Sequence, residues 1–222
     1  MVVSAVIVAA GGSTRMGKPK QFLEINGCPL IVYTLKAFEQ CDRVDDIVLV
    51  ARKEDFATME HLIEQYNIQK IKKVVAGGDS RQESVWNGVS LCDTADYVAI
   101  HDGARPLITP ALITKAITAA VECGAAALGV RVKDTVKRVD ANGFILETPP
   151  REQLWNVQTP QIFKYSLYEK AVAFATENHL TVTDDCQMVE ALGVPVRLIE
   201  GDYTNIKATT PEDIQVAKEW LS

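Results

Sequence analysis

The sequence has few histidines and no closely spaced cysteines. Three histidines and five cysteines are spread over 222 residues, and no two cysteines have the C-x-x-C spacing that is typical of zinc and redox sites. An odd number of scattered cysteines also argues against a disulfide framework. The composition therefore predicts thiols that pack in a core in a reducing cytoplasm, and it gives no signal for a zinc centre.

The chain also lacks an excess of positive charge and a long apolar segment. Its formal net charge is −6 and its sequence pI is near 5.2, which argues against sequence-independent binding of nucleic acid. The one basic cluster, Lys70, Lys72 and Lys73, leads into an apolar pair and is typical of a solvated strand entrance. The apolar N-terminal run, 2–10, is too short for a membrane span and lacks the basic flank of a signal peptide. We expect neither a nucleic-acid partner nor a membrane partner.

Short apolar segments alternate with segments of helical periodicity, as in a parallel sheet covered by helices on both faces. The predicted strands lie near 3–10, 46–51, 72–76, 96–101, 125–132 and 194–199. The predicted helices lie at 29–40, 55–66, 80–92, 109–123 and 210–221, with a loop and helix over 181–193. No linker or low-complexity tract divides the chain. We therefore predict one α/β domain over residues 1–222, with a Rossmann-like, mostly parallel sheet.

The alternation changes between about residues 131 and 160. Polar and apolar residues alternate there around Asn142-Gly143, a pair that favours a tight hairpin turn. A hairpin inserted in a parallel sheet is either an edge decoration or an arm that reaches a second subunit. Because strand edges must be hidden or blunted, we favour a protruding arm over residues 132–156 and a homodimer formed through it.

The loop after the first strand almost matches the phosphate loop G-x-x-x-x-G-K-[ST]. Gly12, Gly17 and Lys18 fit this pattern, but Pro19 stands where a Ser or Thr would bind Mg²⁺. Proline has neither a hydroxyl nor an N–H group, and it disfavours helical geometry at the residue before it. The loop is therefore not that of an ATPase. It is either a plain glycine turn with surface cations or a different nucleotide site.

Charge and position favour a nucleotide site. Arg15, Lys18 and Lys20 lie close to Gly11, near the carboxyl end of a predicted central strand. Open α/β sheets bind ligands at such ends, and glycine amides there can point at phosphate oxygens. This loop therefore combines backbone donors with cations, which is what a triphosphate requires.

A second loop, H-D-G-A-R-P at 101–106, ends another predicted strand. It places the carboxylate of Asp102 beside a flexible glycine and a cation, Arg105. A hard divalent cation takes oxygen ligands and shares them with phosphates. Asp102 is therefore a candidate Mg²⁺ ligand, and the alternative is a structural carboxylate paired with Arg105.

Polar residues mark the starts of two predicted helices. Ser80 followed by Glu83 is the pattern of a capping box. Asp184 and Asp185 precede the later helix, where acids favour the positive end of the helix dipole. We therefore interpret both aspartates as capping residues.

Several segments together resemble the 2-C-methyl-D-erythritol 4-phosphate cytidylyltransferases of the non-mevalonate isoprenoid route. They are AAGGSTRMG with PKQF, GGDSRQESV, HDGARP, VKDTVKR, QTPQ, TDD and NIKATTPED, which run in the family's order from residue 9 to residue 213. The resemblance implies a fold of the nucleotide-diphospho-sugar transferase type. It also implies transfer of CMP from CTP to a polyol phosphate, release of pyrophosphate, and a requirement for Mg²⁺.

The resemblance further implies roles for individual residues. The catalytic cations would be Arg15, Lys20, Arg151 and Lys207, and Asp102 would bind the metal. The cytidine pocket would be formed by Ala9, Ala10, Gly11, Gly78, Asp79 and Ser84. The acceptor would be bound by Asp102, Gly103, Arg105, Thr135, Arg151, Thr159, Thr183 and Lys207. In this family the arm of a partner subunit helps to complete the acceptor site, which supports the predicted homodimer.

The sequence departs from the family pattern in its first loop. Ser13 stands where a glycine is common, and the loop between Arg15 and Lys20 is shorter than in many relatives. Lys20 precedes Gln-Phe and is therefore the match to the family's catalytic lysine. Without the resemblance, Arg151 and Lys207 would be ordinary surface cations.

The residue types suit this chemistry. The attacking group is a phosphate oxyanion, so no strong general base is needed, and the barrier comes from bringing two anions together. The sequence accordingly clusters cations and shows no Ser-His-Asp or Cys-His pattern.

Two alternatives stay open: a ribitol 5-phosphate cytidylyltransferase of the same fold, and a non-catalytic nucleotide-binding module. The presence of Arg15, Lys20, Asp102 and Lys207 together argues against the second.

Overall fold

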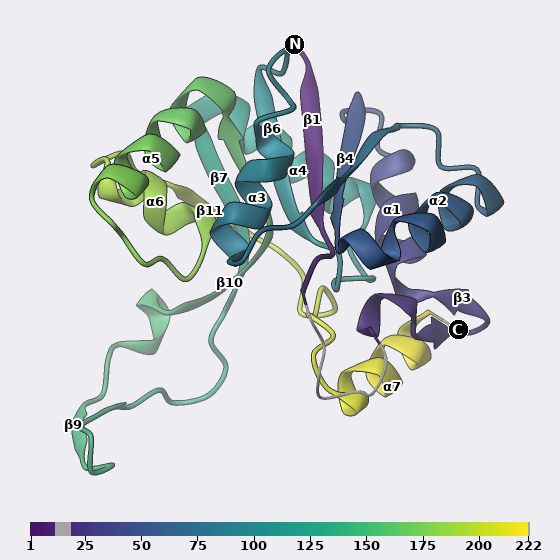
Figure 1. Ribbon diagram of the computed structural model, residues 1–222. Helices are drawn as coiled ribbons and strands as arrows, with labels where there is room; N and C mark the ends of the chain where they lie inside the picture. Colours follow the sequence, from purple (N-terminus) through teal and green to yellow (C-terminus); the bar gives the residue numbers. More distant parts are fainter. Residues whose placement is uncertain (12–18, 222) are drawn as a thin grey trace.

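A seven-stranded sheet runs through the computed structural model, which describes residues 1–11 and 19–221 (Figure 1). Its strand order is β11-β7-β10-β6-β1-β4-β5. The strands are β1 (Val3–Val8), β4 (Asp46–Ala51), β5 (Ile71–Ala76), β6 (Tyr97–Asp102), β7 (Ala125–Arg131), β10 (Trp155–Lys164) and β11 (Arg197–Glu200). Neighbouring strands are parallel except at β10, which runs antiparallel to β6 and β7. The predicted mostly parallel α/β sheet is confirmed.

Helices cover both faces of the sheet because both faces of its strands are apolar. Along β1, Val3, Ala5 and Ile7 point to one face, and Val6 points to the other. The first face packs against α1 (Leu30–Glu39), α2 (Phe56–Gln65) and α4 (Pro110–Cys123). The second packs against α3 (Arg81–Val89), α5 (Tyr165–Glu177) and α6 (Asp185–Ala191). Within residues 1–11 and 19–221, no helix has the length and apolar character that crossing a bilayer requires.

A smaller apolar cluster lies beyond the sheet, under the C-terminal helix α7 (Pro211–Trp220). It joins Ile25, Leu30 and Leu107 to Ala208 and Ala217. The short strands β2 (Glu24–Ile25) and β3 (Cys28–Pro29) lie beside it, and the 3-10 helix η2 (Lys20–Phe22) precedes them. This cluster fixes the chain segments that directly follow Lys20 and Lys207.

The strand order places a crevice between β1 and β6. The chain first builds outward from β1 to β4 and β5, and then returns to the other side of β1 with β6. At such a reversal the two following loops part and leave room for a ligand. The first strand was predicted to continue to Ala10, but β1 ends at Val8. Ala9, whose N–H still bonds to the Val50 carbonyl, and Ala10 line this crevice.

The sequence analysis missed β10 and α5. β10 carries the polar residues Asn156, Gln158, Thr159 and Gln161, and its pairing with β7 shifts register between Val157 and Gln161. Such a polar, irregular segment lacks the apolar signal of a central strand. It is nevertheless buried from Gln158 to Phe163. Its polar side chains there bond to neighbouring segments, as Gln158 does to the Asp202 carbonyl and Gln161 to Asp184.

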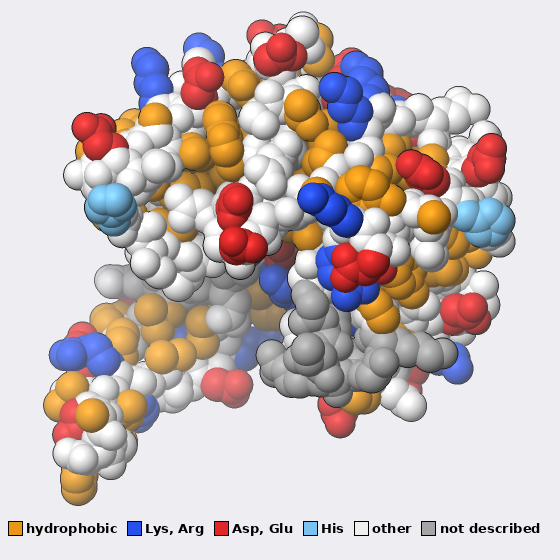
Figure 2. All heavy atoms as spheres, viewed as in Figure 1, with side chains coloured by type: hydrophobic (Ala, Val, Ile, Leu, Met, Phe, Trp, Pro, Cys, Tyr) orange, Lys and Arg blue, Asp and Glu red, His pale blue; other side chains and the backbone are white. Residues whose placement is uncertain are grey.

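The predicted hairpin is present as an arm that projects from the sheet (Figure 1). Its strands, β8 (Arg138–Val139) and β9 (Ile145–Glu147), form a separate two-stranded sheet, so the edge-decoration alternative is wrong. Gly143 adopts φ +85°, and the Asp140 carboxylate accepts bonds from the amides of Asn142 and Phe144. Figure 2 shows hydrophobic side chains over the arm, where Phe144 is 71% exposed. An exposed apolar surface of this kind is typical of a site that contacts another protein surface.

Candidate active site

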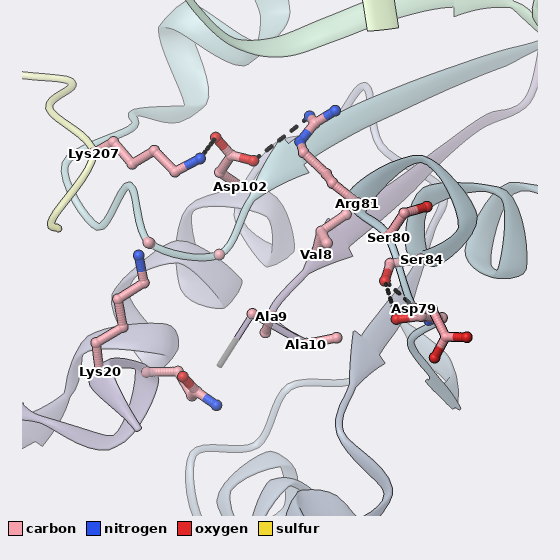
Figure 3. A pocket seen from close by; sticks show the side chains of 15 residues that line it. Val8, Ala9, Ala10, Lys20, Asp79, Ser80, Arg81, Ser84, Asp102 and Lys207 are labelled. Carbon is pink, nitrogen blue, oxygen red and sulfur yellow. Dashed lines mark hydrogen bonds and ion pairs between the residues drawn. The ribbon is translucent and has the colours of Figure 1, made fainter. Parts of the chain in front are cut away.

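A pocket of about 430 Å³ opens at the carboxyl ends of β1 and β6 (Figure 3). It is lined by Val8, Ala9, Ala10, Gly11, Lys20, Gln21, Gly78, Asp79, Ser80, Arg81, Ser84, Asp102, Gly103, Ala104 and Lys207. All six residues predicted to bind cytidine therefore line this one pocket, together with both predicted catalytic lysines, Lys20 and Lys207. Its volume is in the usual range for a small-molecule site.

The loop before α3 is held in place by that helix. Ser84 Oγ accepts the N–H of Gly78 at 3.0 Å, and Glu83 Oε2 accepts the N–H of Asp79 at 2.8 Å. Ser80 Oγ accepts the N–H of Glu83 at 3.0 Å, which confirms the predicted helix start. A side chain at Gly78 would overlap Glu83. Ser84 thus shapes the pocket by fixing the Gly78 backbone.

Asp102 is buried among three cations at the end of β6. Lys207 Nζ lies 2.8 Å from Asp102 Oδ2, Arg81 lies 3.6 Å from Oδ1, and Arg105 Nε lies 3.8 Å from Oδ2. Figure 3 shows Lys207 and Arg81 approaching the carboxylate from opposite sides. Burial alone would raise the pKa of Asp102, but the cations outweigh burial and lower the pKa to about 2. The carboxylate is therefore ionised at neutral pH.

A second pocket of about 190 Å³ adjoins the first. Arg81, Asp102 and Lys207 line both pockets and so form a shared wall. The rest of the second pocket is lined by Arg105, Val157, Gln158, Thr159, Gln161, Thr183 and Asp184. Two adjoining pockets with charged groups between them can hold two anionic ligands side by side.

The loop that carries Lys207 is anchored by buried polar groups. Arg105 donates to the Asn205 carbonyl at 2.7 Å, and Asn205 Nδ2 donates to the Thr159 carbonyl at 3.0 Å. Thr159 Oγ1 accepts the N–H of Asp102 at 3.1 Å and lies 3.0 Å from Nδ1 of His101. Burial lowers the pKa of His101 to about 3, so this histidine is neutral. The network therefore joins the segment that carries Asp102 to the loop that carries Lys207 and keeps these two side chains in contact.

Comparison with known proteins supplies the family. The family model described as "IspD: 2-C-methyl-D-erythritol 4-phosphate cytidylyltransferase" matches residues 3–222. A relative of this name from Caldanaerobacter subterraneus subsp. tengcongensis is 49% identical over 225 residues, which cover 100% of this chain and 99% of the relative. Another from Clostridium perfringens is 46% identical and covers 99% and 98%. The chain belongs to this family.

Solved structures agree with this assignment to the IspD family. A 4-diphosphocytidyl-2C-methyl-D-erythritol synthase from Anaerococcus prevotii superposes with a TM-score of 0.90 at 33% identity, covering 99% of this chain and 96% of that chain. The Thermus thermophilus 2-C-methyl-D-erythritol 4-phosphate cytidylyltransferase gives 0.79 at 32% identity, covering 99% and 98%. The predicted family and the predicted enzyme class, a nucleotidyltransferase, are confirmed. The names of these relatives favour this family over the alternative of a ribitol 5-phosphate cytidylyltransferase.

The family's remaining site residues are placed in different ways. Thr183 lines the second pocket, where Gln187 Oε1 accepts its N–H at 2.9 Å. Thr135 and Arg151 lie on the arm, outside both pocket walls, and Arg151 donates to the Lys133 carbonyl at 3.0 Å. Arg15, like Lys18, lies outside the described residues. One chain therefore does not bring its own Thr135 and Arg151 to its pockets.

One of the two predicted capping aspartates has a different role. Asp184 Oδ1 accepts the N–H of Gln187 at 3.1 Å and caps α6, as predicted. Asp185, in contrast, is wholly buried and forms an ion pair with Arg81 at 2.7 Å. The prediction for Asp185 is wrong because its side chain turns into the molecule, away from the amides of its own helix.

Arg81 is the charged residue of both pockets that the sequence analysis did not predict as a site residue. It lies within the GGDSRQESV segment and lines both pockets. A signal was present, because Arg81 is the first residue of α3 and a cation at the positive end of a helix dipole is unfavourable without a partner. The identity of that partner, more than a hundred positions along the chain, was not readable from the sequence.

We expect Asp102→Asn to lower the stability of the protein by about 3 kcal/mol at neutral pH, because it removes the counter-ion of the buried Arg105 and of the partly exposed Lys207. A carboxylate with a depressed folded pKa contributes stability above its unfolded pKa, roughly 3.9. Its contribution is then lost as the pH falls through the folded value of about 2. Urea unfolding of the wild type and the variant at a series of pH values measures the stability gap, which is the difference between their free energies of unfolding.

The gap should therefore be full at neutral pH and shrink below about pH 4. Glu122→Gln, which removes a carboxylate from an exposed pair with Arg197, is the control and should change little. A gap at neutral pH no larger than that of the control would show that Asp102 does not stabilise the cluster.

Proposed function

We propose that the protein transfers the CMP group of CTP to 2-C-methyl-D-erythritol 4-phosphate, with release of pyrophosphate. The observation that carries this proposal is the pair of adjoining pockets that share Arg81, Asp102 and Lys207, in a chain of the IspD family. The larger pocket offers small side chains and glycine backbone to a nucleotide. The smaller pocket offers hydroxyl and amide groups, such as those of Thr183 and Gln161, to a polyol phosphate.

In the proposed reaction a phosphate oxygen of the acceptor attacks the α-phosphorus of CTP. The bond from that phosphorus to the bridging oxygen breaks, and pyrophosphate leaves with the electron pair. The attacking oxyanion carries no proton that must be removed, so the protein needs to align the substrates and balance their charge. Lys20 and Lys207 lie in the wall of the nucleotide pocket and supply such charge, and Arg15 is the predicted third cation.

Mg²⁺ is the cofactor that we propose, with Asp102 as its protein ligand. Within the described residues, no three His, Cys, Asp or Glu side chains are grouped to hold a metal by themselves. Mg²⁺ is commonly held by one or two carboxylates with the phosphates of a nucleotide, and a buried, ionised Asp102 fits that donor set. When bound, the metal would neutralise charge on the triphosphate oxygens.

We also propose a homodimer in which the arm of each subunit completes the acceptor site of the other. The exposed apolar tip of the arm, with Phe144 and Ile145, supports this. The placement of Thr135 and Arg151 away from the pockets of their own chain supports it as well.

We also propose that the protein works in a reducing cytoplasm. All five cysteines are free thiols, which is consistent with that location.

A pyrophosphate-release assay tests the reaction. We expect release when CTP and Mg²⁺ are supplied with 2-C-methyl-D-erythritol 4-phosphate, and much less with ribitol 5-phosphate, ATP or UTP. Omission of the acceptor gives the background rate. Absence of release with every acceptor would leave only the non-catalytic alternative.

Mixing two inactive variants tests the arm. Lys20→Ala should lower kcat by roughly 10²-fold through loss of a fixed charge, and Arg151→Ala should lower activity through loss of an acceptor contact. If Arg151 acts across the dimer, a mixed dimer has one intact site, built from Lys20 of one subunit and the arm of the other. Activity should therefore return when the variants are refolded together.

The control is each variant refolded alone, which should stay inactive. If Arg151 serves its own subunit, both sites of the mixed dimer are defective, and no recovery would be seen. Sedimentation of the mixture shows that dimers have formed, so the two outcomes are distinguishable.

A further inference from the structure

Arg81 occupies the wall between the two pockets and contacts a carboxylate on each side. One terminal nitrogen lies 2.7 Å from Asp185 Oδ2, and the other lies 3.6 Å from Asp102 Oδ1. Asp102 faces both pockets, but Asp185 lines neither. The stronger of the two ion pairs is therefore made with a residue that no substrate in these pockets can touch.

Asp185 is fixed from several directions. Its Oδ1 accepts the Tyr168 hydroxyl at 2.7 Å, and its N–H donates to Gln161 Oε1 at 3.0 Å. These partners come from α5 and β10, and Arg81 comes from α3. A wholly buried carboxylate is costly unless it is paired and hydrogen-bonded. Its presence here indicates that it holds Arg81 in one place.

We propose that Arg81 is a positioning residue, held by Asp185, that fixes the carboxylate of Asp102 between the two pockets. This inference rests on the proposed function of the site. The planar guanidinium of arginine can face two carboxylates in a fixed fork, which the point charge of lysine cannot do. Asp185 keeps Arg81 at 3.6 Å from Asp102 and so prevents it from closing onto that carboxylate.

Removal of the Asp185 charge should let Arg81 move onto Asp102. Asp102 would then be its nearest counter-ion, and the pairing of Asp102 with Lys207 at 2.8 Å would shift. The rest of the nucleotide pocket, which includes Ala9, Gly78 and Ser84, would keep its place. Alignment between the substrates would suffer more than binding, and a shift of about 1 Å can cost roughly 10²-fold in rate.

The experiment compares Asp185→Asn, Arg81→Met and the double variant in the pyrophosphate-release assay, with kcat and both KM values measured. We expect Asp185→Asn to lower kcat by roughly 10-fold or more while the KM for CTP changes by less than about threefold. In the Arg81→Met background, Asp185→Asn should cause no further loss of kcat, because Asp185 acts through Arg81.

Additive losses in the double variant would overturn the proposal, since Asp185 would then act independently of Arg81. An unchanged kcat in Asp185→Asn would overturn it as well. Tyr168→Phe, which removes one bond to Asp185 and keeps the ring, is the milder variant if Asp185→Asn does not fold. It should lower kcat in the same way but less, and no change in kcat would count against the proposal.

Asp46→Asn is the matched control. Asp46 is also a buried carboxylate in an ion pair, with Lys72 at 2.6 Å, but it lies at the amino end of β4, away from the site. It should cost stability without a change in kcat. Wild-type protein that releases no pyrophosphate would overturn the proposed function, whereas active wild type with additive variants would overturn only the role of Arg81.

Discussion

The pairing of one buried carboxylate with several cations is the interaction on which the site depends. Lys207, Arg81 and Arg105 would repel one another if Asp102 did not lie between them. The low pKa of Asp102, about 2 despite burial, measures how strongly these cations favour its ionised form. The two carboxylates, Asp102 and Asp185, do not fully neutralise the three cations. The cluster therefore has a net positive charge, which attracts phosphate groups.

The fold supplies the positions of these groups through loops that follow neighbouring strands. The reversal of strand order between β1 and β6 opens the crevice, and β10 enters the sheet beside β6 in the opposite direction. This antiparallel strand brings Thr159 to Asp102 and Gln161 to Asp185. Its polar character is thus the consequence of supporting the site from within the sheet.

Much of the scaffold was predictable because its signals are local. Apolar runs located six of the seven main strands, and Ser80 located the start of α3. The glycine loop and Asp102 were recognisable because cations and a carboxylate follow strands. Pro19 argued against a phosphate loop, and it lies just before η2, which carries Lys20.

The remaining features depend on contacts between distant parts of the chain. The polar side chains of β10 serve tertiary contacts and therefore give no strand signal. Asp185 has the sequence pattern of a helix cap, and its buried partner, Arg81, is far away in sequence. Arg151 and Thr135 lie on the arm, outside the pockets of their own chain, and their proposed site is formed with another subunit. No local pattern reports such contacts.

The central claim is that both substrates lie side by side in the adjoining pockets and that CMP passes directly between them. Lys20 and Lys207 also line the nucleotide pocket, so a covalent lysine–CMP intermediate is the chemical alternative. The most direct measurement is the configuration of the product formed from CTP that carries a single, stereochemically defined sulfur on its α-phosphorus. Direct transfer predicts inversion at that phosphorus, and retention would contradict the account because it requires two successive displacements.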